Sequence, residues 1–366
     1  MCDVNRTLDK HKFGFDLDSP PHSQSSFAND CFKLINGHSI LHLMKLFLKE
    51  QLKKSIFLHC IVRIIYNFLG HLRMFLGKIT TDSGTTHDQL SLHDSLTYIH
   101  TVFEDYKKYA GISHFHGHVC ELGPGDSSGV ALALMADGAT KVDLADRFYS
   151  HRDAPYHAQV YQALADQNPR IADLLKAANL QDETTFPGIT RYYGPQAAGE
   201  SYFKERPSTY DFIISRSVLE HTTDPLLTLE SMYHALNPGG YLIHKVDLRD
   251  HGMFTPRHHD LKFLEIPKLV YWAMTHDSGL PNRILIDQYR RCASRLPGDY
   301  QLLITQLAYA GPIDPHVPFD EISKEHLDTA LAELAKHKKS FASVFHKLSE
   351  QDMIVSGFFL IIKKPQ

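Results

Sequence analysis

The sequence predicts an α/β fold built on a mostly parallel sheet with helices on both faces. From Val119 onward, short apolar runs typical of buried strands alternate with helix-length segments, which is the pattern of repeated strand–helix–strand units. The first run, 118–122, leads into a glycine-rich turn and then into a helix that begins near Val130. The second run ends in Asp146, 25 residues after Glu121. Because ligands of such sheets bind beyond the carboxyl ends of the strands, the turn and the acid are expected to share one site.

Seven segments have the length and apolar content of strands. They are 118–122, 140–145, 189–193, 210–215, 240–246, 300–307 and 353–363. A helix is predicted before the first strand, at 92–110, because apolar residues recur there at helical spacing. An insertion at about 247–298, between the fifth and sixth strands, is rich in aromatic, His and Arg residues.

The glycine-rich turn has the features of a nucleotide-type site. Glycine at positions 123 and 125 lets the backbone bend sharply and lets a ligand come closer than any Cβ would allow. The N-terminus of the following helix presents unpaired backbone N–H groups to a polar ligand. The carboxylate of Asp146 stands where it can accept hydrogen bonds from a ribose diol.

Four ordered motifs carry a resemblance to a known family. Glu121-Leu122-Gly123-Pro124-Gly125 resembles motif I of the class I S-adenosylmethionine-dependent methyltransferases, and Asp146 matches the family's ribose-binding acid. Segment 210–221 resembles the fourth strand of the family with its LEH signature, and 236–244 resembles the L-x-P-G-G turn into strand five. The resemblance covers about 117–250 and departs at Ser127, where a third glycine is usual. Segments 245–251 and 281–283 are similar to a bacterial subgroup associated with glycans and secondary metabolites.

The resemblance implies both a fold and a cofactor. The fold is a Rossmann-like sheet of seven strands, in which the last two strands form an antiparallel pair that closes the sheet. The cofactor is S-adenosylmethionine. The residues expected to bind it are Glu121, Gly123, Gly125, Asp146, Arg147 and Ser215.

Methyl transfer to a hydroxyl needs a base that works near neutral pH, and histidine is the usual choice. His251 follows strand five, where Asp247 or Asp250 could orient its ring. We assign His251 and Asp247 as catalytic residues, with His221 of the LEH segment as a further candidate base. His244 lies inside strand five and is expected to be a core histidine.

The turn after strand five has two other interpretations. Asp247, Asp250 and His251 could hold a divalent ion that binds a sugar diol, or they could form a purely structural turn. Hard cations prefer several oxygen ligands, and only two carboxylates are evident in this segment. No metal ligand is therefore assigned.

The insertion offers groups that could recognise the methyl acceptor. Arginine with aromatic side chains suits a phosphorylated or glycosidic acceptor, through bidentate phosphate contacts and stacking. The candidates are Arg249, Arg257, His258, His259, Tyr271, Trp272, Asn282, Arg283 and Tyr289. The expected reaction is O-methylation of a sugar, glycolipid or related small metabolite. The alternatives are N- or C-methylation of a lipid- or quinone-type acceptor, and a cofactor-binding scaffold without catalysis.

Two segments precede the predicted methyltransferase domain, which spans 90–366. Residues 1–30 form a polar tail expected to be disordered. Segment 31–80 is basic, apolar and predicted to be helical, but its cations interrupt any run long enough to span a bilayer. Within it, 41–76 could pack over the catalytic domain as a lid or an oligomer contact. It could also lie in the plane of a membrane, with its cations meeting anionic lipid.

Charge and cysteine content restrict the location and the partners. Residues 31–79 carry eight Lys and Arg but a single acid, Glu50, while the whole chain has a net charge of −4. The rest of the chain is therefore acidic, which argues against general nucleic-acid binding by the catalytic body. The five cysteines form no C-x-x-C pair, which favours a reducing compartment. No cleavable signal peptide is evident. The expected location is cytoplasmic, with peripheral contact at the inner membrane face, and the expected partner is a small-molecule or glycan acceptor.

Overall fold

The computed structural model describes residues 55–76, 80–81, 84–255, 257–276 and 278–366. The chain divides into two compact units, Met1–His59 and Cys60–Gln366, and nearly all of the described residues belong to the second. The predicted tail, 1–30, and the first part of the predicted basic segment, 31–54, lie outside the described residues.

One sheet of eight strands organises the second unit. In spatial order its strands are β5 (Ile189–Tyr193), β3 (Ala139–Asp146), β2 (Gly117–Leu122), β6 (Tyr210–Arg216), β7 (Leu236–Asp247), β10 (Val355–Lys363), β8 (Asp299–Leu307) and β9 (Gly311–Val317). The pairs from β5 to β7 are all parallel. Strand β10 runs antiparallel to both β7 and β8, and β8 runs antiparallel to β9. The predicted fold class and the predicted closing pair are confirmed.

The eighth strand, β9, was not predicted, so the expectation of seven strands was one short. Its sequence contains Pro312 and Pro315, and proline cannot donate to a sheet ladder. The local sequence therefore does not predict a strand in this segment. Proline is tolerated at a sheet edge, and β9 is the outermost strand, paired only with β8.

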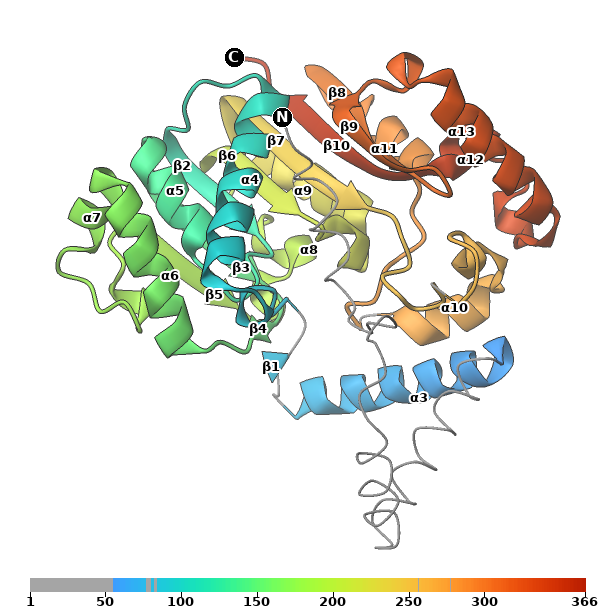
Figure 1. Ribbon diagram of the computed structural model, residues 1–366, viewed down its shortest axis with the longest axis horizontal. Helices are drawn as coiled ribbons and strands as arrows, with labels where there is room; N and C mark the ends of the chain where they lie inside the picture. Colours follow the sequence, from blue (N-terminus) through green and yellow to red (C-terminus); the bar gives the residue numbers. More distant parts are fainter. Residues whose placement is uncertain (1–54, 77–79, 82–83, 256, 277) are drawn as a thin grey trace, which may run out of the picture. The chain divides into compact units, whose positions relative to one another are not determined.

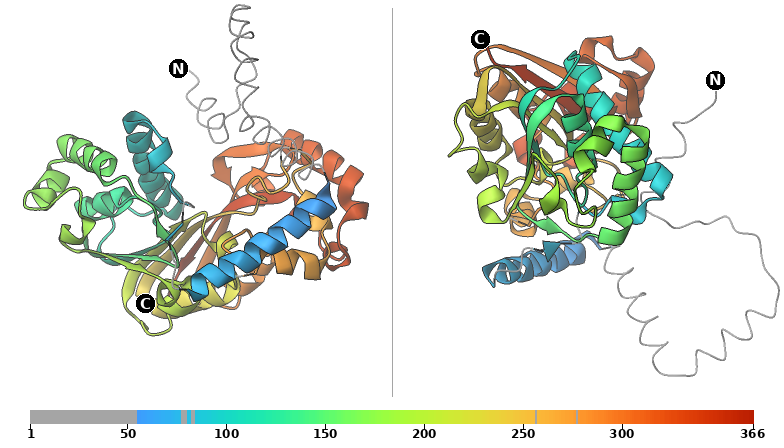
Figure 2. Two further views of the ribbon diagram at one scale, coloured as in Figure 1. Left: turned by 90° about the horizontal axis from the view of Figure 1, so that it is seen from below. Right: turned by 90° about the vertical axis from the view of Figure 1, so that its left-hand side faces the viewer.

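Helices cover both faces of the sheet, as Figures 1 and 2 show. One face is covered by α4 (Leu92–Ala110), α5 (Gly129–Asp137), α6 (Ala154–Gln167) and α7 (Pro169–Leu175). The other face is covered by α8 (Gly199–Tyr202), α9 (Pro225–Ala235) and α11 (Ile286–Ala293). The remaining helices are α10 (Lys268–Thr275), α12 (Lys324–His337) and α13 (Glu350–Ile354). A short parallel pair joins β1 (Thr80–Thr81) to β4 (Tyr149–Ser150).

Strand β10 shows why the sheet is stable between its two helix layers. All of its residues except the last, Lys363, are buried, as expected for a strand covered on both faces.

Helix α4 begins at a Ser91 side chain that accepts from the backbone N–H of Asp94 and ends at Gly111 in the left-handed conformation. The predicted helix at 92–110 is confirmed.

Helix α3 (Ile56–Phe75) lies within the predicted helical segment 31–80. The side chain of Asn67 donates to the Ala273 carbonyl at 3.0 Å, and His71 Nε2 lies 2.9 Å from the His276 carbonyl. These contacts join α3 to the end of α10. Among the described residues, no helix is both long and apolar enough to cross a membrane.

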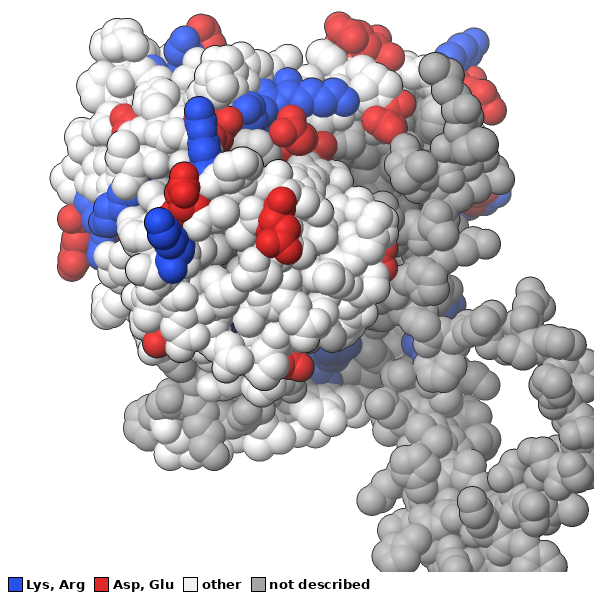
Figure 3. Space-filling view, turned by 60° about the vertical axis from the view of Figure 1, so that its left-hand side comes forward, with Lys and Arg blue, Asp and Glu red and all other residues white. Residues whose placement is uncertain are grey.

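The surface around α6 and α7 carries charges of both signs. Figure 3 shows Lys and Arg side chains interspersed with Asp and Glu on this face. Such a mixture is typical of a solvent-facing surface and differs from the single-sign stripe that phosphate backbones attract.

Candidate functional site

The loop that follows β2 is shaped by two glycines in the left-handed conformation. Gly123 has φ 71° and Gly125 has φ 65°. A Cβ at position 123 would lie 2.3 Å from Val218 Cγ2, and one at position 125 would lie 2.8 Å from the Gly84 carbonyl oxygen. The sequence explained these glycines by the approach of a ligand. The structure adds a second reason, because the chain itself approaches both positions too closely for any side chain.

A half-buried arginine that the sequence did not single out holds the loop in place. Arg191, on β5, donates to the Gly125 carbonyl at 2.9 Å and to Ser128 Oγ at 3.3 Å. Its guanidinium also pairs with Glu183 Oε2 at 3.1 Å. An arginine inside a predicted buried strand is the only sequence signal that could have identified it, because its partners are far away in the chain.

A second unpredicted contact crosses the loop from the segment before α4. The backbone N–H of Asp126 donates to the Gly84 carbonyl at 3.2 Å. In return, Asp126 Oδ2 accepts from the backbone N–H of His87 at 3.0 Å. The stretch between α3 and α4 is therefore tied directly to the glycine-rich loop.

Two carboxyl groups flank this loop at the ends of neighbouring strands. Glu121 is buried at the end of β2, its Oε2 has no hydrogen-bond partner, and burial raises its pKa to about 7. Asp146 ends β3 and accepts from the backbone N–H of Phe148 at 2.9 Å. Burial raises the pKa of Asp146 to about 6. An unpartnered buried carboxylate oxygen beside a glycine cradle fits the amino and ribose groups of S-adenosylmethionine.

Two other predicted cofactor residues, Arg147 and Ser215, are engaged with the protein. Arg147 follows β3 and donates to Thr223 Oγ1 at 3.3 Å. Ser215 is fully buried, and its hydroxyl lies 2.8 Å from His244 Nδ1. Burial lowers the pKa of His244 to about 3, so His244 is a neutral core histidine as predicted. A direct contact of Arg147 or Ser215 with the cofactor stays a prediction.

The three predicted catalytic residues do meet at the ends of β6 and β7. The rings of His221 and His251 are edge to face, with centroids 4.6 Å apart. His251 Nε2 lies 3.9 Å from Asp247 Oδ2 and 3.3 Å from the Asp247 carbonyl oxygen. A fourth residue joins them, since Glu220 Oε1 lies 3.6 Å from His251 Nε2. We call Glu220, His221, Asp247 and His251 the strand-end cluster.

The pKa values of three residues in the strand-end cluster are strongly shifted. Burial, with repulsion from Asp247, raises the pKa of Glu220 well above its usual range. Burial also acts on Asp247, but hydrogen bonds from Arg249 outweigh it and hold the Asp247 pKa at about 2. Burial and the neighbouring His251 lower the pKa of His221 to about 4. The Nδ1 of His221 lies 2.8 Å from the Gly279 carbonyl and therefore carries the hydrogen, which leaves Nε2 with a lone pair.

Asp250, which the sequence offered as an alternative orienting acid, has a structural role. Its carboxylate accepts from the backbone N–H groups of Gly252, Phe254 and Thr255 and from the Thr255 hydroxyl. These bonds fold the turn 250–255 on itself. His251 sits in that turn with φ 49°, and Ser217, just after β6, has φ 54°. Left-handed non-glycine residues are uncommon and concentrate at functional sites.

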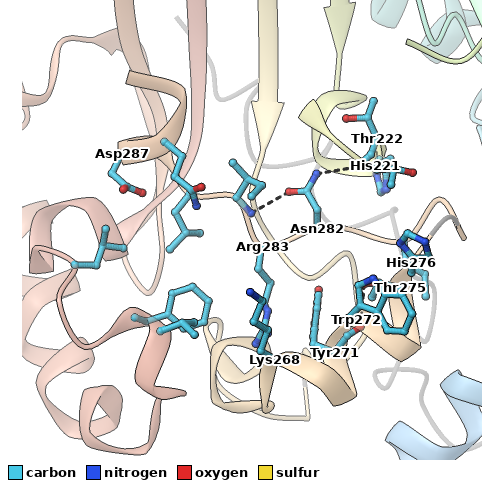
Figure 4. A pocket seen from close by; sticks show the side chains of 18 of the residues that line it. His221, Thr222, Lys268, Tyr271, Trp272, Thr275, His276, Asn282, Arg283 and Asp287 are labelled. Atoms are coloured by element: carbon cyan, nitrogen blue, oxygen red, sulfur yellow. Dashed lines mark hydrogen bonds between the residues drawn. The ribbon is translucent and has the colours of Figure 1, made fainter. Parts of the chain in front are cut away.

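A cavity of about 530 Å³ adjoins the strand-end cluster through His221. Its walls come from the turn after β6, from α10, from 280–291 and from 344–348. Figure 4 shows Lys268, Tyr271 and Trp272 on α10 and Arg283 on the facing loop. Asn282 fixes this loop to the turn after β6, because its side chain donates to the carbonyls of Leu219 and Thr222 at 3.0 and 3.1 Å.

Four of the nine predicted recognition residues line the cavity, namely Tyr271, Trp272, Asn282 and Arg283. Three of the others have different environments. Arg249 pairs with Asp247, His259 bonds with Tyr309 and Glu265, and Tyr289 is fully buried. Three cations that the sequence did not select, Lys268, Arg291 and Lys347, also line it.

Comparisons with known proteins agree with the family resemblance. A family model described as a methyltransferase domain matches residues 95–296, more than half of the chain. No curated protein matches the sequence. A similar solved structure is phosphoethanolamine N-methyltransferase 2 of Haemonchus contortus in complex with S-adenosyl-L-methionine, at 15% identity and a TM-score of 0.37, with 73% of this chain and 53% of that chain covered. Another is the YcgJ protein of Bacillus subtilis, at 11% identity and a TM-score of 0.37, with 73% and 99% covered.

The chain thus spans about half the length of the Haemonchus enzyme. With TM-scores of 0.37, the two structural likenesses add nothing to the assignment, which depends on the family match and on the geometry above.

The affinity for S-adenosylhomocysteine is expected to fall as pH is lowered through about 6, where Asp146 becomes protonated. Only the ionised carboxylate accepts two hydrogen bonds from a ribose diol, so the dissociation constant should rise about tenfold per pH unit below that point. Calorimetric titrations between pH 5 and 8 measure this dependence.

Asp146→Asn is the matched variant for this titration. It should weaken binding at pH 8 by about 2–3 kcal/mol, through loss of two charge-assisted hydrogen bonds, and should remove the step near pH 6. Glu121→Gln tests whether a further change in affinity near pH 7 comes from Glu121, whose pKa is about 7. A step that persists in Asp146→Asn would assign the titration to another group.

Gly123→Ala is expected to destabilise the fold and weaken cofactor binding together. A left-handed alanine costs about 1–2 kcal/mol, and the new Cβ would overlap Val218. Thermal unfolding with and without S-adenosylhomocysteine measures both effects. Gly70→Ala is the control, because nothing lies within 4 Å of that position and alanine favours a helix. Equal stability of Gly123→Ala and the wild type would contradict the steric argument.

Proposed function

Because the chain belongs to the class I methyltransferases, which use S-adenosylmethionine, we propose that it methylates an oxygen of a phosphorylated or glycosidic small-molecule acceptor. The observation that carries this proposal is the cavity beside His221, with four cationic side chains in its walls. Arg283 is the most enclosed of them, since it stacks on Tyr271 at 4.1 Å and donates to the carbonyls of Phe263 and Ile266. It makes no ion pair with any described carboxylate, so its charge is available to an anionic ligand.

The cavity has the size and the mixed chemistry of a small-molecule site. Its volume lies within the usual range for such pockets, about 300–1,000 Å³. Trp272, which is 56% exposed, offers a stacking surface for a sugar or a base, and the cations suit phosphate oxygens. Among the described residues of the walls, Asp287 is the one carboxylate, and it is already paired with Arg291 at 2.6 Å.

S-Adenosylmethionine supplies an activated methyl group on a sulfonium. A new oxygen–carbon bond forms while the carbon–sulfur bond breaks, and its electron pair stays on sulfur as S-adenosylhomocysteine is released. The protein must align the acceptor oxygen and remove its proton. Glu121, Gly123, Gly125 and Asp146 are the residues proposed to hold the cofactor, with Arg147 and Ser215 beside them.

We assign the removal of the proton to the strand-end cluster. His251 is the proposed acceptor in the absence of a bound ion, because the Asp247 carboxylate, 3.9 Å from its Nε2, would stabilise the imidazolium that forms. Asp247 is a positioning residue, since its carboxylate is already held by Arg249 at 2.6 Å. His221 has a pKa near 4, too low for an efficient base at neutral pH.

Peripheral membrane contact through 41–76 is a separate part of the proposal. In the described part of this segment, Phe68 is 68% exposed, and on the neighbouring α10 Leu269 is 79% and Trp272 56% exposed. Large apolar side chains beside basic residues such as Lys268 suit the interface of an anionic membrane. A cytoplasmic location at the inner membrane face follows from this assignment and from the cysteine pattern.

The enzyme is expected to convert S-adenosylmethionine into S-adenosylhomocysteine when a phosphorylated sugar or a lipid-linked glycan is present as the methyl acceptor. The double variant Lys268→Gln/Lys347→Gln should raise the KM for an anionic acceptor about tenfold, because each exposed cation contributes up to about 1 kcal/mol to binding of the acceptor. The kcat should stay within about twofold of the wild-type value. Lys324→Gln/Lys339→Gln is the control on another surface. Transfer only to neutral acceptors, with an unchanged KM in the double variant, would overturn the acceptor assignment.

Sedimentation with vesicles of anionic lipid tests the membrane assignment. The full chain should pellet with the vesicles, and Phe68→Glu/Leu72→Glu should reduce the pelleted fraction severalfold by placing charge on the apolar face of α3. Leu227→Glu, on α9, is the control. If the α3 variant pellets like the wild type, the membrane assignment is wrong. If it instead turns a dimer into a monomer in light scattering, the face is an oligomer contact.

A further inference from the structure

Three side chains in the strand-end cluster converge on one point. Glu220, His221 and His251 each present one potential ligand atom, and these atoms all lie within 4.8 Å of one another. Glu220 and His221 lie in the short 3-10 turn η4 (Leu219–His221), which follows β6, and His251 lies in the turn after β7. Because β6 and β7 are parallel neighbours, the two turns meet at the same edge of the sheet.

Glu220 is the decisive residue. Its side chain is completely buried, and neither carboxylate oxygen has a hydrogen-bond partner. A buried carboxylate without partners is costly, and proteins keep such groups when they pair with cations or coordinate metals. Its Oε1 lies 3.6 Å from His251 Nε2, so the orphaned oxygen lies next to the two imidazoles.

His221 is oriented as a metal-binding histidine is. Its Nδ1 donates to the Gly279 carbonyl at 2.8 Å, which fixes the tautomer and leaves the Nε2 lone pair for a ligand. A backbone carbonyl on the far nitrogen is the usual outer partner of histidines that bind metals. The ring also forms part of the wall of the cavity described above.

We propose that Glu220, His221 and His251 bind one divalent transition-metal ion. Two imidazole nitrogens and one carboxylate suit zinc and neighbouring ions such as cobalt, whereas magnesium and calcium prefer oxygen ligands. Metal–nitrogen distances of about 2.0–2.1 Å put tetrahedral ligand atoms about 3.4 Å apart. The gap of 3.6 Å between Glu220 and His251 is already close to this value.

The proposed ligands differ from the set that the sequence considered. Both carboxylate oxygens of Asp250 accept hydrogen bonds within the turn 250–255, and Asp247 is paired with Arg249. Asp247 therefore acts as a neighbouring acid at 3.9 Å from His251 Nε2. Glu220 and His221 replace the two aspartates, and only His251 is common to both sets.

Three protein ligands leave at least one coordination position open, the arrangement found in catalytic rather than structural zinc sites. His221 borders the cavity, so the open position is accessible to a ligand held there. A bound ion would act as a Lewis acid on an acceptor hydroxyl and would lower the pKa of that hydroxyl, so that its proton could pass to solvent rather than to His251. The metal site does not depend on which acceptor is methylated.

Cobalt(II) is the probe for this proposal. The full-length protein, stripped with a chelator, should bind Co²⁺ with 1:1 stoichiometry, develop visible absorption bands and gain thermal stability. Glu220→Gln keeps the shape of the side chain and places no charge in the interior, so it is expected to fold. It should weaken Co²⁺ binding by more than about 100-fold, since even outer partners of metal ligands are worth about 10- to 100-fold. His251→Ala should have the same effect.

The chain has 25 histidines, so nonspecific binding needs a matched control. His100→Ala serves, because His100 is exposed on α4 and its ring makes a surface hydrogen bond with Gln167. It should leave the affinity and the spectrum unchanged. Absence of stoichiometric Co²⁺ or Zn²⁺ binding by the folded wild type, or equal affinity in Glu220→Gln, would overturn the proposal.

The metal site and the proposed function can fail separately. Methyl transfer to phosphorylated acceptors without metal binding would contradict the metal site alone. Metal binding without transfer to any phosphorylated or glycosidic acceptor would contradict the acceptor assignment alone.

Discussion

The parallel pairing of β3, β2, β6 and β7 is the constraint on which the site depends. Parallel neighbours place their carboxyl ends at one edge, so residues far apart in the chain become adjacent, as Leu122 and Ser215 do. The chain takes a left-handed residue immediately after β2 and β6, at Gly123 and Ser217, and another in the turn that follows β7, at His251. These sharp turns keep the functional side chains at the edge. Without them, each strand would run on past the site.

The same edge concentrates buried carboxyl groups, which makes the ligand-free fold sensitive to pH. Glu121 and Asp146 have pKa values raised by burial to about 7 and about 6. A carboxyl whose folded-state pKa exceeds its unfolded value of about 4 disfavours the folded state once pH rises above 4. The fold therefore gives up stability near neutral pH at positions where a bound ligand can recover it. Arg191, paired with Glu183, is the main opposing charge beneath the loop.

Local sequence patterns were enough for the seven predicted strands, because each is an apolar run of ordinary length. They were not enough for β9, where two prolines conceal an edge strand. The glycine-rich loop and Asp146 were recognisable, but Arg191 was not, since its bond to Gly125 joins positions 66 residues apart. Asp250 resembled an orienting acid because the sequence does not show that its carboxylate folds the turn back. Glu220 was read as part of a family signature, and only burial reveals its unpartnered oxygens.

The charges around the cavity favour one orientation of an acceptor bound in it. The far walls of the cavity hold Lys268, Arg283 and Lys347, whereas the end at His221 adjoins the strand-end cluster, in which Asp247 stays ionised. The phosphate of the proposed acceptor is attracted to the cations and repelled by the Asp247 carboxylate. The hydroxyl end of the acceptor then points toward the edge of the sheet, where the proposed cofactor site lies. A divalent ion bound to Glu220 would cancel the negative charge at this end, and it would orient the acceptor instead by offering a coordination position to its oxygen. In the ion-free protein, the cavity and the strand-end cluster thus favour one orientation of the proposed anionic acceptor.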